Sequence, residues 1–309
     1  MQIQYFEPLS RAWNYMVNAL FKPFDIGKWF VLGFSAFLAD LLEGPGFSGA
    51  NHWKTGNYKG LHGLFSIPEL IKEWFLEHPG IVALIISGVF LAIAIAVLFV
   101  WLSSRGKFIF LDNVIHDRAL VTQPWYKFKN EGNSLFIWRL IFGIISFLII
   151  IFWVALLVFI IINNQNGDVA PHIGFIFLMV VSMLFIIFAI LYISTFLTDF
   201  IVPIMYKNRL SATEAWRIFL DIFSQHWLYF IFYGVMKFFL YILVVAGVVL
   251  IGFFTCCFGF ILLIIPYLSS VVMLPVSVTF RGFSVTFLEQ FGTEFKLFPE
   301  EENVVAANE

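Results

Sequence analysis

Long apolar stretches alternate with short polar segments along this chain. A helix needs about 20 apolar residues to cross the hydrocarbon core of a bilayer, which is roughly 30 Å thick. Five stretches are long enough to span, namely residues 80–102, 135–162, 172–198 with an apolar extension to 206, 227–253 and 258–280. A sixth stretch, residues 26–42, is shorter, and we expect it to span because Lys28 and Asp40 can extend toward opposite interfaces. The pattern therefore predicts six transmembrane helices.

The polar segments between these spans share a short motif. A shift of 91 residues places RALVTQPW (118–125) on RLSATEAW (209–216), and LSRAW (9–13) supplies a third copy. Each copy has Ser or Thr, any residue, Ala or Pro, and then Trp. A hydroxyl at the N-cap, here Ser10, Thr122 and Thr213, is typical of a helix start. We expect three amphipathic helices, either lying in the headgroup region with Trp13, Trp125 and Trp216 as interfacial anchors or packed on the helix bundle.

The repeat predicts an all-α polytopic membrane protein with a single membrane domain, residues 1–295. Three helical hairpins, at about 8–102, 112–206 and 209–280, are followed by an amphipathic helix over 281–292. Small residues at matching depth, such as Gly143 and Gly234, favour close packing of the hairpins. Residues 296–309 form an acidic tail that we expect to be disordered.

Composition and charge agree with a membrane location. The chain is 61% hydrophobic and 12% charged, and its mean hydropathy of +0.92 excludes a soluble domain of this length. Outside the six predicted spans, 13 Lys and Arg residues fall on one side, against Lys54, Lys59 and Lys72 on the other. The positive-inside rule then predicts that both termini are cytoplasmic. The net charge of −2 and the lack of a basic run give no support for nucleic-acid binding.

Three charged residues in the predicted spans are the candidates for chemistry. Lys237 lies about 16 Å into its span, near the bilayer midplane, where a charge costs about 2.5 to 3.5 kcal/mol. It forms either a substrate or proton site or a structural ion pair. Asp199 and Arg139 lie near the same ends of neighbouring spans, and we expect them to pair and stabilise helix packing. Asp112 is expected to face the interfacial water.

Catalytic and cofactor motifs are missing from the sequence. It contains no Gly-x-Ser-x-Gly, Walker or dinucleotide-binding motif, and its six histidines lack metal-ligand spacing. We therefore expect no catalytic residues, no cofactor and no metal, and a protein that is not an enzyme.

The stretch YKNRLSATEAWRIFLDIFSQHWLYFIFY, which follows a span ending in an apolar residue and Pro, resembles a known membrane domain. It is similar to the cytoplasmic turn of the glycerophosphoryl diester phosphodiesterase membrane domain and of related uncharacterised bacterial multi-spanning proteins, over about residues 105–291. That family sometimes carries a soluble phosphodiesterase barrel, for which this chain has neither the length nor a His-Arg-Gly start nor a Glu-x-Asp metal pair. The resemblance implies a topology and a bacterial inner-membrane location.

Together, these features favour a non-enzymatic scaffold, accessory subunit or lipid-interacting protein. Its expected partners are membrane lipids and a protein bound through the amphipathic helices. The alternative is a small transporter or channel with Lys237 near its pathway. A third class, an enzyme acting on lipid, would need a cluster of carboxylates or histidines at the cytoplasmic rim.

Overall fold

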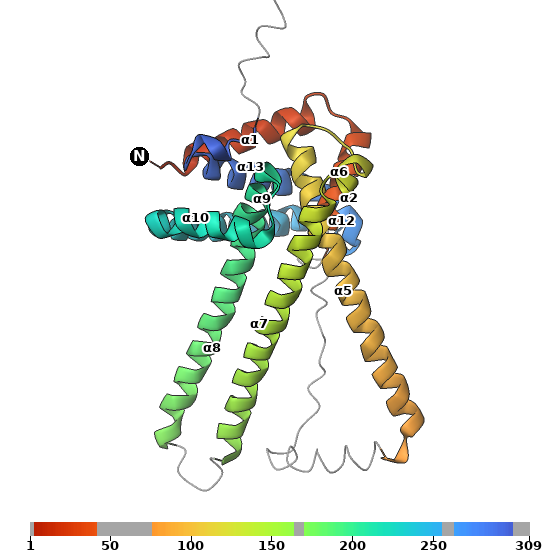
Figure 1. Ribbon diagram of the computed structural model, residues 1–309, viewed down its shortest axis with the longest axis vertical. Coiled ribbons are helices and arrows are strands. Elements are labelled where there is room, and N and C mark those ends of the chain that lie inside the picture. Colours follow the sequence, from red (N-terminus) through yellow and green to blue (C-terminus); the bar gives the residue numbers. More distant parts are fainter. Residues whose placement is uncertain (1–2, 42–75, 164–169, 255–262, 299–309) are drawn as a thin grey trace, which may run out of the picture.

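Three long helices extend from a layer of helices at one end of the molecule (Figure 1). The computed structural model describes residues 3–41, 76–163, 170–254 and 263–298, and the secondary structure within them is helical throughout. The three helices that extend from the layer are α5 (Pro79–Ile115), α7 (Lys129–Asn163) and α8 (Ala170–Phe196). The other helices are α1 (Phe6–Phe21), α2 (Ile26–Ala39), α6 (Thr122–Lys127), η2 (Leu197–Ile201), α9 (Val202–Asn208), α10 (Ala212–Phe254), α12 (Pro266–Val272), α13 (Leu274–Glu289) and η3 (Thr293–Phe295).

The described residues contain four helices that are long and apolar enough to cross a membrane, which indicates a multi-pass membrane protein. They are Pro79–Ile115, Lys129–Ile160, Phe177–Asn208 and Ala212–Phe254. The pair α12 and α13 is a fifth candidate, but it bends by 64° at the break between the two helices. The apolar helix α2 has only 14 residues, fewer than the roughly 20 that a straight span requires. The all-α prediction is confirmed, whereas six spans are not.

The core of the protein lies at one end of the long helices, beyond their apolar stretches. Residues 103–115 of α5 are all buried, although the sequence predicted a loop from residue 103 to residue 134. The loop prediction is wrong because the helix continues past its apolar stretch and enters the core. Aromatic rings fill much of this core, and the largest buried ones are Phe108, Phe200, Phe219, Phe230, Tyr233, Phe283 and Phe287.

Helix α10 is broken at His226, whose backbone angles (φ −132°, ψ 27°) are not helical. The break brings the rings of Phe219 and Phe230 to 5.2 Å from each other, although the two residues are eleven positions apart in the sequence. Figure 1 shows the labelled part of α10 running across the upper end of α8. The two halves of α10 therefore contribute to one aromatic cluster.

Helix α1 packs against α13, near the two ends of the described chain. Gln4 and Gln290 exchange two hydrogen bonds, from the Gln4 N–H to Oε1 (2.8 Å) and from Nε2 to the Gln4 carbonyl (2.9 Å). Thr286 of α13 donates to the carbonyl oxygen of Pro8 in α1 at 3.1 Å. The buried face of α1 repeats every fourth residue, at Pro8, Ala12, Met16 and Leu20. This face packs on the protein, as the packed alternative for the three motif helices predicted.

The shared motif positions a buried residue and does not cap a helix. Helix α1 begins at Phe6, before Ser10, and Thr122 is the first residue of α6 without a side-chain cap. In α10 the cap is Ser211, whose N–H donates to Glu214 Oε2 at 2.9 Å in a capping box. The predicted N-caps Ser10, Thr122 and Thr213 are therefore wrong. The Ala or Pro of each copy is buried instead, at Ala12, Pro124 and Ala215.

The packing of α2 on α5 depends on Gly106. A Cβ atom at this position would lie 2.5 Å from the Leu38 carbonyl carbon and 2.6 Å from the Ala39 nitrogen. Because these are backbone atoms, Gly106→Ala must push the two helices apart, and we expect it to lower the free energy of unfolding by about 1 to 3 kcal/mol. Thermal unfolding in detergent measures the effect. Gly88→Ala on the same helix is the control, because a Cβ there meets nothing within 4 Å. Equal melting temperatures would refute the close approach.

Candidate functional site

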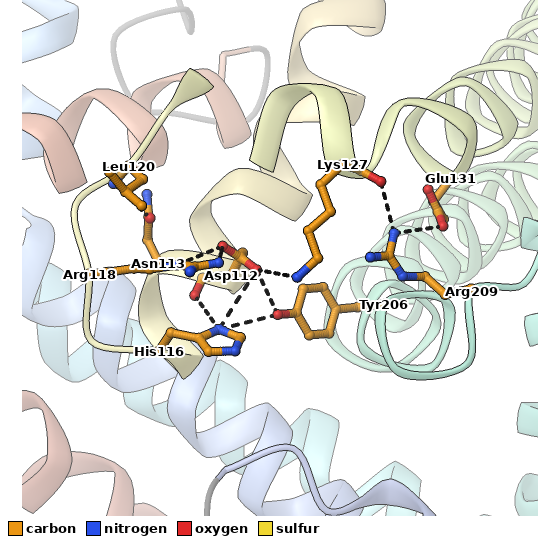
Figure 2. A network of polar contacts seen from close by, with 9 residues as sticks. All are labelled: Asp112, Asn113, His116, Arg118, Leu120, Lys127, Glu131, Tyr206 and Arg209. Carbon is orange, nitrogen blue, oxygen red and sulfur yellow. Dashed lines mark hydrogen bonds and ion pairs between the residues drawn. The ribbon is translucent and has the colours of Figure 1, made fainter. Parts of the chain in front are cut away.

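Asp112 is the centre of a polar network near the end of α5 (Figure 2). Its side chain is 0% exposed. Arg118 donates to Oδ2 from Nη2 at 2.5 Å and from Nε at 3.2 Å, while the Tyr206 hydroxyl donates to Oδ1 at 2.8 Å. Both carboxylate oxygens are therefore satisfied. The whole set is called the Asp112 network below and consists of Asp112, Asn113, His116, Arg118, Leu120, Lys127, Glu131, Tyr206 and Arg209.

Two further basic groups lie near the same carboxylate at longer range. The Lys127 Nζ is 3.8 Å and the His116 Nδ1 is 3.7 Å from Oδ1 of Asp112. These distances exceed those of hydrogen bonds, so these contacts with Oδ1 are electrostatic. The expectation that Asp112 faces water is wrong, because α5 continues as a helix and carries the residue into the core.

The chain after α5 turns back toward Asp112. Asp117 has φ 48°, a left-handed conformation that Asp tolerates better than most residues, and the next residue is Arg118. The Leu120 N–H donates to Asn113 Oδ1 at 3.0 Å, which holds the returning segment in place. From α1, the Tyr15 hydroxyl donates to the Val114 carbonyl, and burial together with the nearby Asp117 carboxylate raises the pKa of Tyr15. This turn brings the guanidinium group of Arg118 to the buried carboxylate.

Arg209 connects three helices on the other side of the network. It follows α9 and has φ 56°, and its Nη1 donates to the Lys127 carbonyl (2.9 Å) and to Glu131 Oε1 (3.1 Å). Its guanidinium carbon lies 4.2 Å from the centroid of the Phe128 ring. The residue therefore links the end of α9 to α6 and to the start of α7.

A second polar group surrounds η2, a π-helical segment between α8 and α9. Asp199 Oδ2 accepts from Lys237 Nζ at 2.5 Å and from the Tyr233 hydroxyl at 3.0 Å. The neighbouring Thr198 accepts from Lys107 Nζ at its hydroxyl (3.1 Å) and from Arg281 Nη1 at its carbonyl (2.6 Å). We call these six residues the η2 cluster. Short π-helical segments occur often at functional sites, so the cluster is the second candidate site.

The structure brings together two of the three charged residues that the sequence indicated. Lys237 pairs with Asp199, as the structural interpretation of that lysine predicted. Arg139, which we expected to pair with Asp199, instead donates from Nη1 to the hydroxyls of Ser103 (3.0 Å) and Ser104 (3.3 Å) on α5. Hydropathy places each residue on a span but does not fix which faces of two helices meet.

Two of the three motif tryptophans contact neighbouring helices. Trp125 lies 5.7 Å from Trp101 and 5.0 Å from the guanidinium carbon of Arg105. Trp216 stacks on Trp138 of α7 at 5.3 Å. Trp13 is 56% exposed on α1. These contacts favour helices packed on the bundle, and a role of the tryptophans as membrane anchors stays a prediction.

Sequence reasoning missed most of the residues in the two polar groups. Arg118, Tyr206, Lys107 and Arg281 were not identified as site residues. The available signal for Asp112 was its position as an acidic residue within the otherwise apolar run FIFLDNVI, residues 108–115. In the part of the chain that the structure describes, no three His, Cys, Asp or Glu side chains are placed to hold a metal ion.

One family model matches the chain. The model of a family of unknown function, DUF7544, matches residues 3–288, which is most of the chain. No curated protein and no solved structure matches the chain. The match includes both polar networks and all four candidate spans. The chain therefore belongs to the DUF7544 family of unknown function.

Proposed function

We propose that this protein is a non-enzymatic scaffold or accessory subunit of a membrane, whose long helices are covered by lipid and by the helices of a partner protein. The observation that carries the proposal is the exposure of the apolar helices. In the most apolar 18-residue window of each of the four candidate spans, at most 6% of the residues are buried inside the protein. Such surfaces must be covered by lipid or by other membrane helices.

The Asp112 network fits a structural role better than a catalytic one. The carboxylate of Asp112 is buried and already bonded to Arg118 and Tyr206, so a lipid substrate has no access to it. Asp112 and His116 do lie close together at this end of the molecule, as an enzyme acting on lipid would require, but their contacts connect helices. A rigid layer of this kind supports a scaffold, because it holds the exposed helices at fixed positions.

The repeated hairpin remains part of the proposal, and two local features support it. Phe108 stacks on Phe128 and Phe200 stacks on Phe219, each with an interplanar angle of 11°. The second residues of the pairs are 91 positions apart, which is the shift of the motif, and the first residues are 92 apart, so the two stacked pairs agree with the repeat to within one residue. The left-handed residues Asp117 and Arg209 are also 92 positions apart.

The finer features of the location are also proposals. The six spans rest on the hydropathy pattern, the cytoplasmic termini on the distribution of basic residues, and the bacterial inner membrane on the resemblance to the glycerophosphoryl diester phosphodiesterase membrane domain. The family match neither requires nor opposes that resemblance.

Purification from native membranes tests the scaffold function. A tagged full-length chain, extracted in a mild detergent, is expected to retain a specific protein or an enriched lipid that a similarly tagged unrelated membrane protein lacks. Leu84→Ala combined with Leu91→Ala removes exposed apolar surface from one face of α5 without touching the core, so it should reduce partner recovery several-fold. Recovery of neither protein nor enriched lipid would contradict the proposal and favour transport.

The second candidate, a small transporter or channel, is favoured by the η2 cluster. Ionisable residues in membrane segments commonly mark ion or substrate pathways, and Asp199, Tyr233 and Lys237 lie together within candidate spans. A transporter should lose flux in the double variant Asp199→Asn with Lys237→Leu, which removes both charges together and is therefore expected to remain folded. A scaffold should keep its partner in the same variant.

A further inference from the structure

The outer edge of the Asp112 network carries two basic side chains with donors still available. Lys127 is the last residue of α6, and Arg209 follows the last residue of α9. Their side chains are 38% and 42% exposed, respectively, whereas Asp112 beside them is fully buried. Both cations are therefore accessible at the edge of the buried network (Figure 2).

Fixed contacts hold the two cations beside the same aromatic ring. The Arg209 guanidinium carbon lies 4.2 Å and the Lys127 Nζ lies 5.1 Å from the centroid of the Phe128 ring. Arg209 Nη1 also bonds to the Lys127 carbonyl, so the backbone of one cation positions the side chain of the other. The left-handed backbone of Arg209 fixes the direction in which its side chain leaves the chain.

The two nearby carboxylates leave donors of Lys127 and Arg209 unused. Asp112 bonds to other residues, and Glu131 bonds to one nitrogen of Arg209. Asp112 uses both oxygens for Arg118 and Tyr206, and its separation of 3.8 Å from Lys127 Nζ is too long for a hydrogen bond. Glu131 accepts from a single nitrogen of Arg209, Nη1. Both cations therefore keep donors that a bound anion can use.

The surrounding sequence adds more positive charge. The segments 127–131 (KFKNE) and 207–209 (KNR) contain four basic residues and one acidic residue. An anion approaching this edge meets a positive field over both segments.

From this arrangement we infer that Lys127 and Arg209 form a binding site for a phosphate group. A guanidinium group presents a planar set of donors that matches phosphate oxygens, and an ammonium group adds a compact charge that can bond a third oxygen. The phosphate belongs either to a lipid headgroup or to a soluble phosphate ester. Both supply the same oxyanion.

Binding to the full-length chain in an uncharged detergent tests the site. Native mass spectrometry measures retention of phosphatidylglycerol against a diacylglycerol with the same acyl chains, and thermal unfolding measures stabilisation by inorganic phosphate against chloride at equal ionic strength. We expect Lys127→Gln to weaken binding of the effective probe by about tenfold, the loss of one charge-assisted hydrogen bond. Lys127→Arg should retain binding.

Lys22→Gln is the matched control, because Lys22 is an exposed lysine at the end of α1, on a different part of the chain. We expect Lys127→Gln to fold, because Asp112 keeps its hydrogen bonds with Arg118 and Tyr206. Retention of phosphatidylglycerol alone identifies a lipid phosphate, and stabilisation by inorganic phosphate alone identifies a soluble one. Unchanged binding in Lys127→Gln, or equal loss in Lys22→Gln, overturns the inference.

Discussion

Replacing Asp112 with alanine is expected to lower the free energy of unfolding by about 3 to 5 kcal/mol, the usual cost of removing one partner from a buried ion pair. The substitution leaves Arg118 and the Tyr206 hydroxyl without the acceptor that both of them use. It also leaves the nearby charge of Lys127 without compensation. Chemical or thermal unfolding in detergent measures the loss.

A neighbouring carboxylate provides the control for this prediction. Asp117 pairs with Lys28 at 2.8 Å, but its side chain is half exposed, and such pairs contribute roughly 0 to 1 kcal/mol. Asp117→Asn, which tolerates the same left-handed backbone, should therefore change stability little. Similar losses for Asp112→Ala and Asp117→Asn would show that Asp112 does not organise the network.

The second large effect is expected at the η2 cluster, where Asp199→Asn or Lys237→Met alone should each destabilise the protein by about 3 to 5 kcal/mol. Either change leaves one charge in apolar surroundings without its partner, since Asp199 is buried and Lys237 bonds to it directly. Combining the two changes removes both charges. We expect the double variant to recover most of the loss.

The double-mutant cycle isolates the pair from the rest of the cluster. Tyr233→Phe removes only the hydroxyl that donates to Asp199 and should cost about 1 kcal/mol, which provides a scale for the charge effects. Additive losses in the double variant would mean that Asp199 and Lys237 do not stabilise the protein as a pair. Unfolding in detergent and retention of a monodisperse species in size-exclusion chromatography follow each variant.

Hydropathy predicted the long helices well because lipid exposure demands apolar side chains on every face. The predicted spans 80–102, 135–162, 172–198 and 227–253 all overlap candidate spans of the structure. The pattern could not show that α5 continues to Ile115 or that the last predicted span bends at the start of α13. Both features depend on packing within the buried layer, where polar and apolar residues occur together.

The candidate site was less predictable than the spans. Lys237 and Asp199 stood out because charges are costly in apolar segments, and they do pair. The predicted pair of Asp199 with Arg139 was wrong, because spacing along the chain does not give the rotation of one helix against another. Asp112 and Tyr206 are 94 positions apart, and no local pattern connects them. Contacts of that range become visible only in the folded chain.

The packing of α1 against α13 has a consequence for how a ribosome makes this protein. Gln4 can form its hydrogen bonds only after Gln290 has been synthesised, and the carbonyl of Pro8 can accept its hydrogen bond only after Thr286 has been synthesised. During translation, the buried face of α1 therefore lacks its cover until α13 emerges. A chain arrested before residue 286 would keep that apolar face exposed.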